Sequence, residues 1–188
     1  LIALDPADAA SVAEAIPVLE SLTGALDLLV IAPAEPGAHD RASDAARDEA
    51  LPTMSGTGLV EHYRRHAVAP VLLVRTLLPW LVAGDGARVL MISSWLGSLA
   101  GKTQGGDYAT CASAAALHML TRALANDLAE QHITVCLGNP GNFATTPNDP
   151  AFRIPIDEAA LGLLVQSDRL SRERTGTFVD WTGAERAW

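Results

Sequence analysis

The chain has 188 residues, of which 49% are hydrophobic, and this is enough apolar material for the core of one domain spanning residues 1–188. Its formal net charge is −9, and a chain this acidic is poorly suited to bind nucleic acid or an acidic membrane surface. With only two cysteines, Cys111 and Cys136, we expect no disulfide framework, and a reducing cytoplasm is the expected location.

Strand-like and helix-like segments alternate along the chain. Short, continuously apolar runs predict strands at residues 1–5, 25–33, 87–94, 133–141 and 175–183. Helical patterns predict helices at residues 10–24, 57–82, 108–131 and 156–169, whereas residues 34–55 indicate a loop or a weak helix. Apolar strands that alternate with helices predict an α/β fold with a doubly wound parallel sheet.

Two further patterns argue against a membrane span and a metal site. The longest apolar run, residues 69–84, contains Arg75 and two prolines, which is unusual for a transmembrane helix. The two cysteines have no other ligand candidates beside them in the sequence, so we expect small buried apolar side chains there. No His, Cys, Asp and Glu grouping has metal-ligand spacing, and no metal is expected.

The pattern with the most chemical meaning lies in residues 89–142, which read VLMISSWLGSLAGKTQGGDYATCASAAALHMLTRALANDLAEQHITVCLGNPGN. A predicted strand ends in two serines, Tyr108 begins a long predicted helix, and the next strand ends in Asn-Pro-Gly. This arrangement resembles the core of the short-chain dehydrogenase/reductases, which have a Rossmann-like fold. Their reaction uses a Ser, a Tyr and a Lys one helical turn after the Tyr. The resemblance assigns Ser94 and Tyr108 to the first two positions and puts Ala112 at the lysine position.

Other segments carry the same resemblance, with departures at functional positions. Residues 26–35, LDLLVIAPAE, take the place of the family's LDVLVNNAG, and His66 stands where a catalytic Asn is usual. The segment TGTFVDWTG at 175–183 resembles the family's final strand. The glycine-rich turn TGxxxGxG does not occur in the chain, and the segment 145–152 is short for a substrate lid. We therefore expect N-terminal strands and a lid that are missing or reduced.

These departures bear directly on chemistry. A tyrosine phenol has an ordinary pKa near 10, so it needs a neighbouring cation to act as a base at neutral pH. Ala112 cannot supply one, and Lys102 and Arg122 are the other cations nearby in the sequence. We therefore interpret Ser94 and Tyr108 as a remnant pair. His66 is either a general base or, as we prefer, a polar side chain that fills a pocket without function.

The resulting hypothesis is a degenerate, non-catalytic subunit that supports an active NAD-dependent paralogue in a hetero-oligomer, a dimer or tetramer. This subunit is expected to bind no cofactor, with NAD in the partner. The family pairs active with decayed subunits in a CoA-thioester dehydrogenase, which implies a hydroxyacyl-CoA substrate. The helices at 57–82 and 109–131 correspond to the pair that builds the family's four-helix interface.

Three alternatives remain open. An active NAD(P)-dependent oxidoreductase would carry its glycine-rich turn upstream of Leu1. A lyase similar to the halohydrin dehalogenases, which use Ser, Tyr and Arg, is suggested by the C-terminal TGTFVDWTGAERAW, but its Arg would belong at Ala112. A regulatory binding protein is the third alternative.

Overall fold

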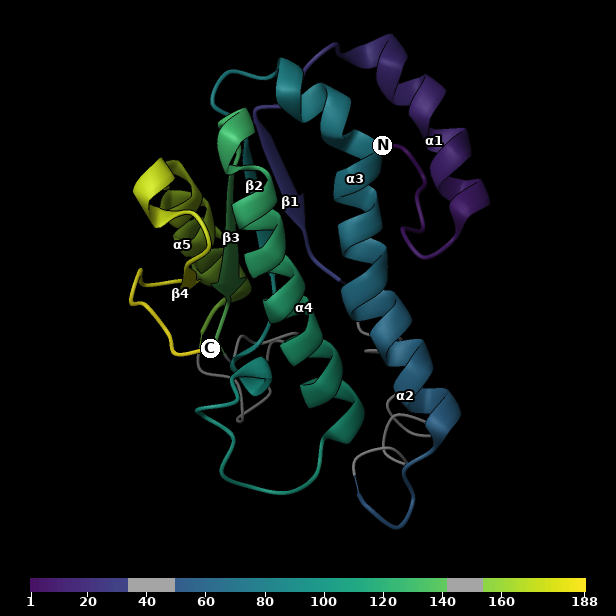
Figure 1. The fold of residues 1–188 in the computed structure, drawn as a ribbon, viewed down its shortest axis with the longest axis vertical. Helices are drawn as coiled ribbons and strands as arrows, with labels where there is room; N and C mark the ends of the chain where they lie inside the picture. Colours follow the sequence, from purple (N-terminus) through teal and green to yellow (C-terminus); the bar gives the residue numbers. More distant parts are fainter. Residues whose placement is uncertain (34–49, 142–153) are drawn as a thin grey trace.

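A four-stranded parallel sheet forms the centre of the computed structural model, which describes residues 1–33, 50–141 and 154–188 (Figure 1). Its strands lie side by side in the order β1 (Leu28–Ile31), β2 (Arg88–Ile92), β3 (Thr134–Asn139) and β4 (Phe178–Asp180). Every neighbouring pair is parallel. The sequence prediction of a parallel, Rossmann-like α/β fold is therefore confirmed.

Helices cover both faces of this sheet. They are α1 (Ala9–Leu22), α2 (Gly56–Tyr63), α3 (Ala69–Ala83), α4 (Tyr108–Asp127) and α5 (Ile156–Asp168). A π-helical turn, η2 (Arg64–Val68), joins α2 to α3 without a break. Helices α1, α3 and α4 lie on one face and α5 lies on the other (Figure 1).

Alternation along the central strands divides the core between the two faces, because successive strand residues point to opposite sides of a sheet. Val89 and Met91 pack into the larger cluster with residues of α3 and α4, such as Leu117. Leu90 and Cys136 pack on the opposite side with Leu163 of α5 and its neighbours. Burial raises the pKa of the Cys136 thiol to about 12, so this cysteine behaves as the apolar side chain that the sequence predicts.

The predicted strand at residues 1–5 is wrong. These residues form no strand, and the side chains of Leu1 and Leu4 are exposed. A strand needs a hydrogen-bonding neighbour, and no strand in the described parts of the chain lies on the outer side of β1. The helix that follows is capped at its N-terminus by Asp8, whose Oδ1 accepts a hydrogen bond of 3.0 Å from the backbone N–H of Ala10.

The helix predicted at 57–82 runs continuously over Gly56–Ala83, with the π-turn inside it. By length and composition alone, this 28-residue stretch could cross a membrane. In this fold its inner face belongs to the core, through Leu73, Val74, Leu77 and Leu81. Three parts of the sequence analysis lie outside the described residues: most of the predicted loop at 34–55, Asn142, and the short segment at 145–152.

Candidate functional site

The candidate site lies at the carboxyl edge of the sheet, where ligands of open parallel sheets bind. Ser93 and Ser94 follow β2 directly, Asn139 ends β3 and Asp180 ends β4. The strand order puts these three ends next to each other. The two serines are half-buried, whereas Asn139 and Asp180 are buried. The parallel sheet therefore gathers the serines and the Asn-Pro-Gly turn at one edge.

Residues 93–101, called the serine loop below, begin with hydrogen bonds that occupy both hydroxyl groups. Ser94 Oγ accepts a bond of 3.2 Å from the N–H of Leu96 and so caps the short turn Trp95–Gly97. Ser93 Oγ shares a hydrogen bond of 3.1 Å with Nε2 of His118 on α4. The N–H of Ser93 donates to the carbonyl of Gly138, 2.8 Å away, which fixes the loop to β3.

His118 is a site residue that the sequence analysis missed. Its side chain is 3% exposed, and its ring packs on Phe178 and Trp188 with centroids 4.7 and 5.7 Å away. Burial lowers the pKa of His118 to about 4, against a smaller opposing effect of a backbone hydrogen bond at Ser94, so the imidazole is neutral at pH 7. The sequence pattern that could have identified His118 is its position on the buried face of α4, one residue after Leu117.

The direction of α4 decides which of its residues can serve the site. The buried residues of α4 are Ala109, Ser113, Ala114, Leu117, His118, Thr121 and Ala125. Ala112 is exposed, so a lysine at that position would extend into solvent. Tyr108 is half-buried in the first turn and shares no hydrogen bond with Ser94 in the described parts of the chain. This geometry argues against the assignment of Ala112 to the lysine position.

Thr110 and Ala114 have the same spacing of four residues and lie closer to the buried face. Thr110 is half-buried and Ala114 is 8% exposed. A methyl group added to Gly97 of the serine loop would lie 2.8 Å from the carbonyl carbon of Ala114. Where α4 approaches the serine loop it therefore has an alanine, and the residue four positions earlier is a half-buried threonine.

The two cations that the sequence offers as replacements are engaged elsewhere. Lys102 Nζ donates to the carbonyl of Gly106 at 3.1 Å and lies 4.0 Å from the carboxylate of Asp107, just before α4. The Arg122 guanidinium stacks over the Trp188 ring, 5.4 Å from its centroid. Both contacts stabilise local structure, and neither cation forms a hydrogen bond with Tyr108 in the described parts of the chain.

His66 lies in the π-turn, where it is 8% exposed and stacks on the ring of His62 with centroids 5.2 Å apart. Single π-turns inside helices are often found at functional sites. Turn η2 also packs against α4. Its role as a base or as a pocket-filling side chain stays a prediction.

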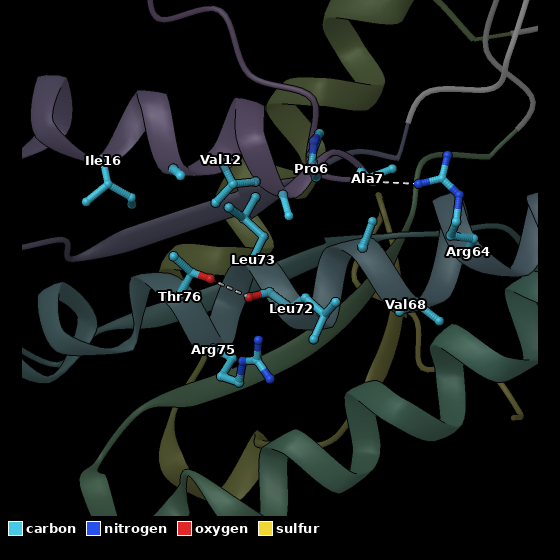
Figure 2. Close-up of a pocket in the computed structure, with 13 residues that line it drawn as sticks. Pro6, Ala7, Val12, Ile16, Arg64, Val68, Leu72, Leu73, Arg75 and Thr76 are labelled. Carbon is cyan, nitrogen blue, oxygen red and sulfur yellow. Dashed lines mark hydrogen bonds between the residues drawn. The ribbon is translucent and has the colours of Figure 1, made fainter.

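A cavity of about 450 Å³ lies between α1 and the α2–α3 helix, away from this edge (Figure 2). Val12 and Ile16 line it from α1, and Leu72 and Leu73 line it from α3. At one end Arg64 donates to the carbonyl of Ala7 (Figure 2). None of the site residues expected from the sequence lines this cavity.

Comparison with known proteins gives one family. The sequence profile described as short chain dehydrogenase matches residues 1–153. C-signal of Myxococcus xanthus is 35% identical over 123 residues, which are 65% of this chain and 74% of C-signal. The 1-hydroxy-2-glutathionyl-2-methyl-3-butene dehydrogenase of Rhodococcus sp. is 30% identical over 128 residues, and the match spans 55% of that enzyme.

Solved structures agree on the fold. NADPH-bound carbonyl reductase from chicken fatty liver superimposes with a TM-score of 0.84 at 28% identity, covering 100% of this chain and 76% of the reductase. Carbonyl reductase Sniffer of D. melanogaster superimposes with a TM-score of 0.85, covering 98% of this chain and 76% of Sniffer. At 23% identity, the second likeness shows the fold alone.

Proposed function

This chain belongs to the short chain dehydrogenase family of oxidoreductases, and on that premise we propose that it is a degenerate, non-catalytic member that supports an active NAD-dependent dehydrogenase of the same fold. One observation carries the proposal. Ala114 lies where α4 approaches Gly97 of the serine loop, and Thr110 precedes it by the four residues that separate the family's tyrosine from its lysine.

The remaining polar groups are poorly suited to transfer a proton. A threonine hydroxyl does not ionise near neutral pH, and no cation on the first three turns of α4 activates it. The imidazole of His118 is neutral, but its Nε2 is already engaged in the hydrogen bond with Ser93 Oγ. A positioned acid–base group contributes roughly 100- to 10,000-fold to a rate, and none is recognisable among the residues that the structure describes at this edge.

The nicotinamide cofactor that the family implies does not fit the described residues. In the family, the lysine also holds the nicotinamide ribose, and here the buried Ala114 offers no donor. Lys102 is bonded to the backbone of its own loop. We therefore derive no reaction step through a cofactor in this subunit and expect NAD in the partner, with a hydroxyacyl-CoA thioester as the substrate of the complex.

Exposed apolar side chains on the helices support an assembly. Tyr63 is 45% exposed, Leu72 is 39% exposed and Met119 is 67% exposed, on α2, α3 and α4 respectively. These helices lie on the same face of the sheet (Figure 1). A dimer or tetramer that covers them with the helices of an active paralogue would bury these side chains.

An active NAD(P)-dependent oxidoreductase is the second candidate, favoured by the 28% identity to a reductase that binds NADPH. Calorimetry of the full chain with NADH and with NADPH separates the two proposals, with an intact carbonyl reductase as the positive control. We expect no binding at micromolar concentration. A micromolar dissociation constant, or carbonyl reduction that Thr110→Ala abolishes, would favour the second candidate.

The partner requires a separate experiment. Purification of the chain from its own cells is expected to yield a stable complex with a second, intact short chain dehydrogenase. Substitution of Met119 by Glu places a charge on the exposed helix face and is expected to release that partner, whereas Glu130→Lys, on the exposed turn after α4, is the control. A monomeric mass of the native protein, with no co-purifying dehydrogenase, contradicts this part of the proposal.

A further inference from the structure

The last residues of the chain are tied to the end of the sheet by backbone and side-chain contacts. The N–H of Arg186 donates to the carbonyl of Phe178 at 2.8 Å, and the N–H of Asp180 donates to the carbonyl of Ala184 at 2.9 Å. The Arg186 guanidinium also forms an ion pair with the buried carboxylate of Asp180. Residues 184–188, called the tail below, therefore have a fixed path along β4.

This path brings Trp188 onto the serine loop, and the chain end marked C lies beside the segment that follows β2 (Figure 1). The carbonyl of Trp188 accepts a hydrogen bond of 3.2 Å from the N–H of Ala100. Its ring meets His118 edge-on, with an interplanar angle of 82°. On the same ring, Arg122 makes the cation–π contact and Phe178 packs with centroids 5.8 Å apart.

The serine loop is thus held near both of its ends. His118 binds the Ser93 hydroxyl at the start, and the Trp188 carbonyl binds the Ala100 amide near the end. Because the Trp188 ring also packs on His118, the two attachments share one aromatic cluster. Its members lie on β4, α4 and the tail, so three separate segments determine where Ser94 stands.

We infer that Trp188 and His118 are positioning residues, and that the tail clamps the serine loop and fixes the Ser94 turn at the sheet edge. The clamp holds the serine loop in place for any molecule that binds at this edge of the sheet. The inference therefore does not depend on whether this subunit is catalytic. Loss of the Trp188 ring should therefore loosen the serine loop before it affects the central strands.

Hydrogen exchange of the full chain tests the clamp through the amides of Gly97 and Ala100, which bond to Ser94 and Trp188. With Trp188→Ala, we expect their exchange to accelerate at least tenfold while the amide of Val135 in β3 keeps its protection. Trp188→Phe keeps an aromatic ring and should restore most of the protection. The His118 ring resonances should shift in Trp188→Ala and return toward their native positions in Trp188→Phe.

The matched control is Leu163→Ala, which removes a buried side chain from the α5 face of the sheet. It lowers global stability without touching the cluster around Trp188, so Gly97 and Ala100 should respond no more than Val135 does. Equal acceleration by Leu163→Ala and Trp188→Ala, or unchanged loop exchange in Trp188→Ala, overturns the inference. Should Trp188→Ala fail to fold, Trp188→Leu, which keeps apolar volume without the ring, gives the same comparison.

Discussion

Gly97 and His118 approach each other so closely that a methyl group on Gly97 would lie 2.6 Å from the imidazole Nε2. Real side chains essentially never make carbon contacts this short. The glycine therefore leaves the space through which the His118 ring reaches Ser93, at 3.1 Å. The same imidazole also packs on the ring of Trp188 in the tail. His118 therefore contacts both the serine loop and the tail.

Gly97→Ala should displace either the His118 ring or the serine loop. Overpacking in a buried position typically costs about 1–3 kcal/mol, and we expect a loss in this range in the free energy of unfolding. Gly105→Ala is the matched control, because nothing lies within 4 Å of its added methyl group. Urea denaturation of both variants checks the prediction, and equal stability of the two would show that the close contact carries no strain.

A lysine scan of α4 tests which turn faces the serine loop. Ala112→Lys places the ammonium on an exposed face, so the free energy of unfolding should change by no more than about 0.5 kcal/mol. Ala114→Lys puts the ammonium at a position that is only 8% exposed, which should cost at least about 2 kcal/mol. The reverse order of the two losses would restore Ala112 as the site position.

The buried imidazole of His118 makes stability depend on pH. Its pKa is lowered to about 4 in the folded chain, from an ordinary value of 6.5. Between these values the unfolded chain binds a proton that the folded chain does not, so stability falls as pH decreases through this window. The full difference corresponds to about 3 kcal/mol. His118→Asn should flatten the curve between pH 6.5 and 4, and an unchanged slope would refute the assignment.

The alternation of apolar strands with helices made the fold predictable from the sequence. Val89, Leu90 and Met91 are consecutive and all buried, as expected for a strand covered on both faces. The strand predicted at residues 1–5 failed because a strand depends on a neighbour that a local pattern does not reveal. Contacts such as Ser93 with His118 are likewise invisible locally, since 25 residues separate the pair.

The site was harder to predict because a single tyrosine fixed the alignment of α4. Tyr108 and Ala112 have the spacing of the family's pair, but spacing does not tell which face of the helix they occupy. The spacing of the buried residues does identify the face. Ala109, Ser113 and Leu117 repeat every four residues on the buried face of α4, and Ala112 lies on the exposed face. A residue type that matches a motif should therefore be accepted only after its helical face has been checked.

Asp180 holds the tail in place, and its replacement should act on both stability and the serine loop. Its carboxylate is 2% exposed and accepts hydrogen bonds from Thr182, from the N–H of Ala184 and from Arg186. Burial alone would raise the pKa of Asp180, but the bonds from Thr182 and Arg186 outweigh it and hold the pKa below its ordinary value of 3.8. The charged form is therefore the one that the fold stabilises.

Asp180→Asn removes this charge and should lower the free energy of unfolding by about 1–3 kcal/mol at pH 7. Because the folded pKa is depressed, the native advantage is present above pH 3.8 and is lost as pH falls through the folded pKa. Asp168→Asn is the control, since its side chain is 72% exposed and its pair with Arg88 should contribute less than about 1 kcal/mol.

Asp180→Asn should also accelerate hydrogen exchange at Ala100, because a loosened tail no longer fixes Trp188. Equal losses of stability in both variants, with Ala100 unaffected, would show that the Asp180 contacts do not anchor the tail.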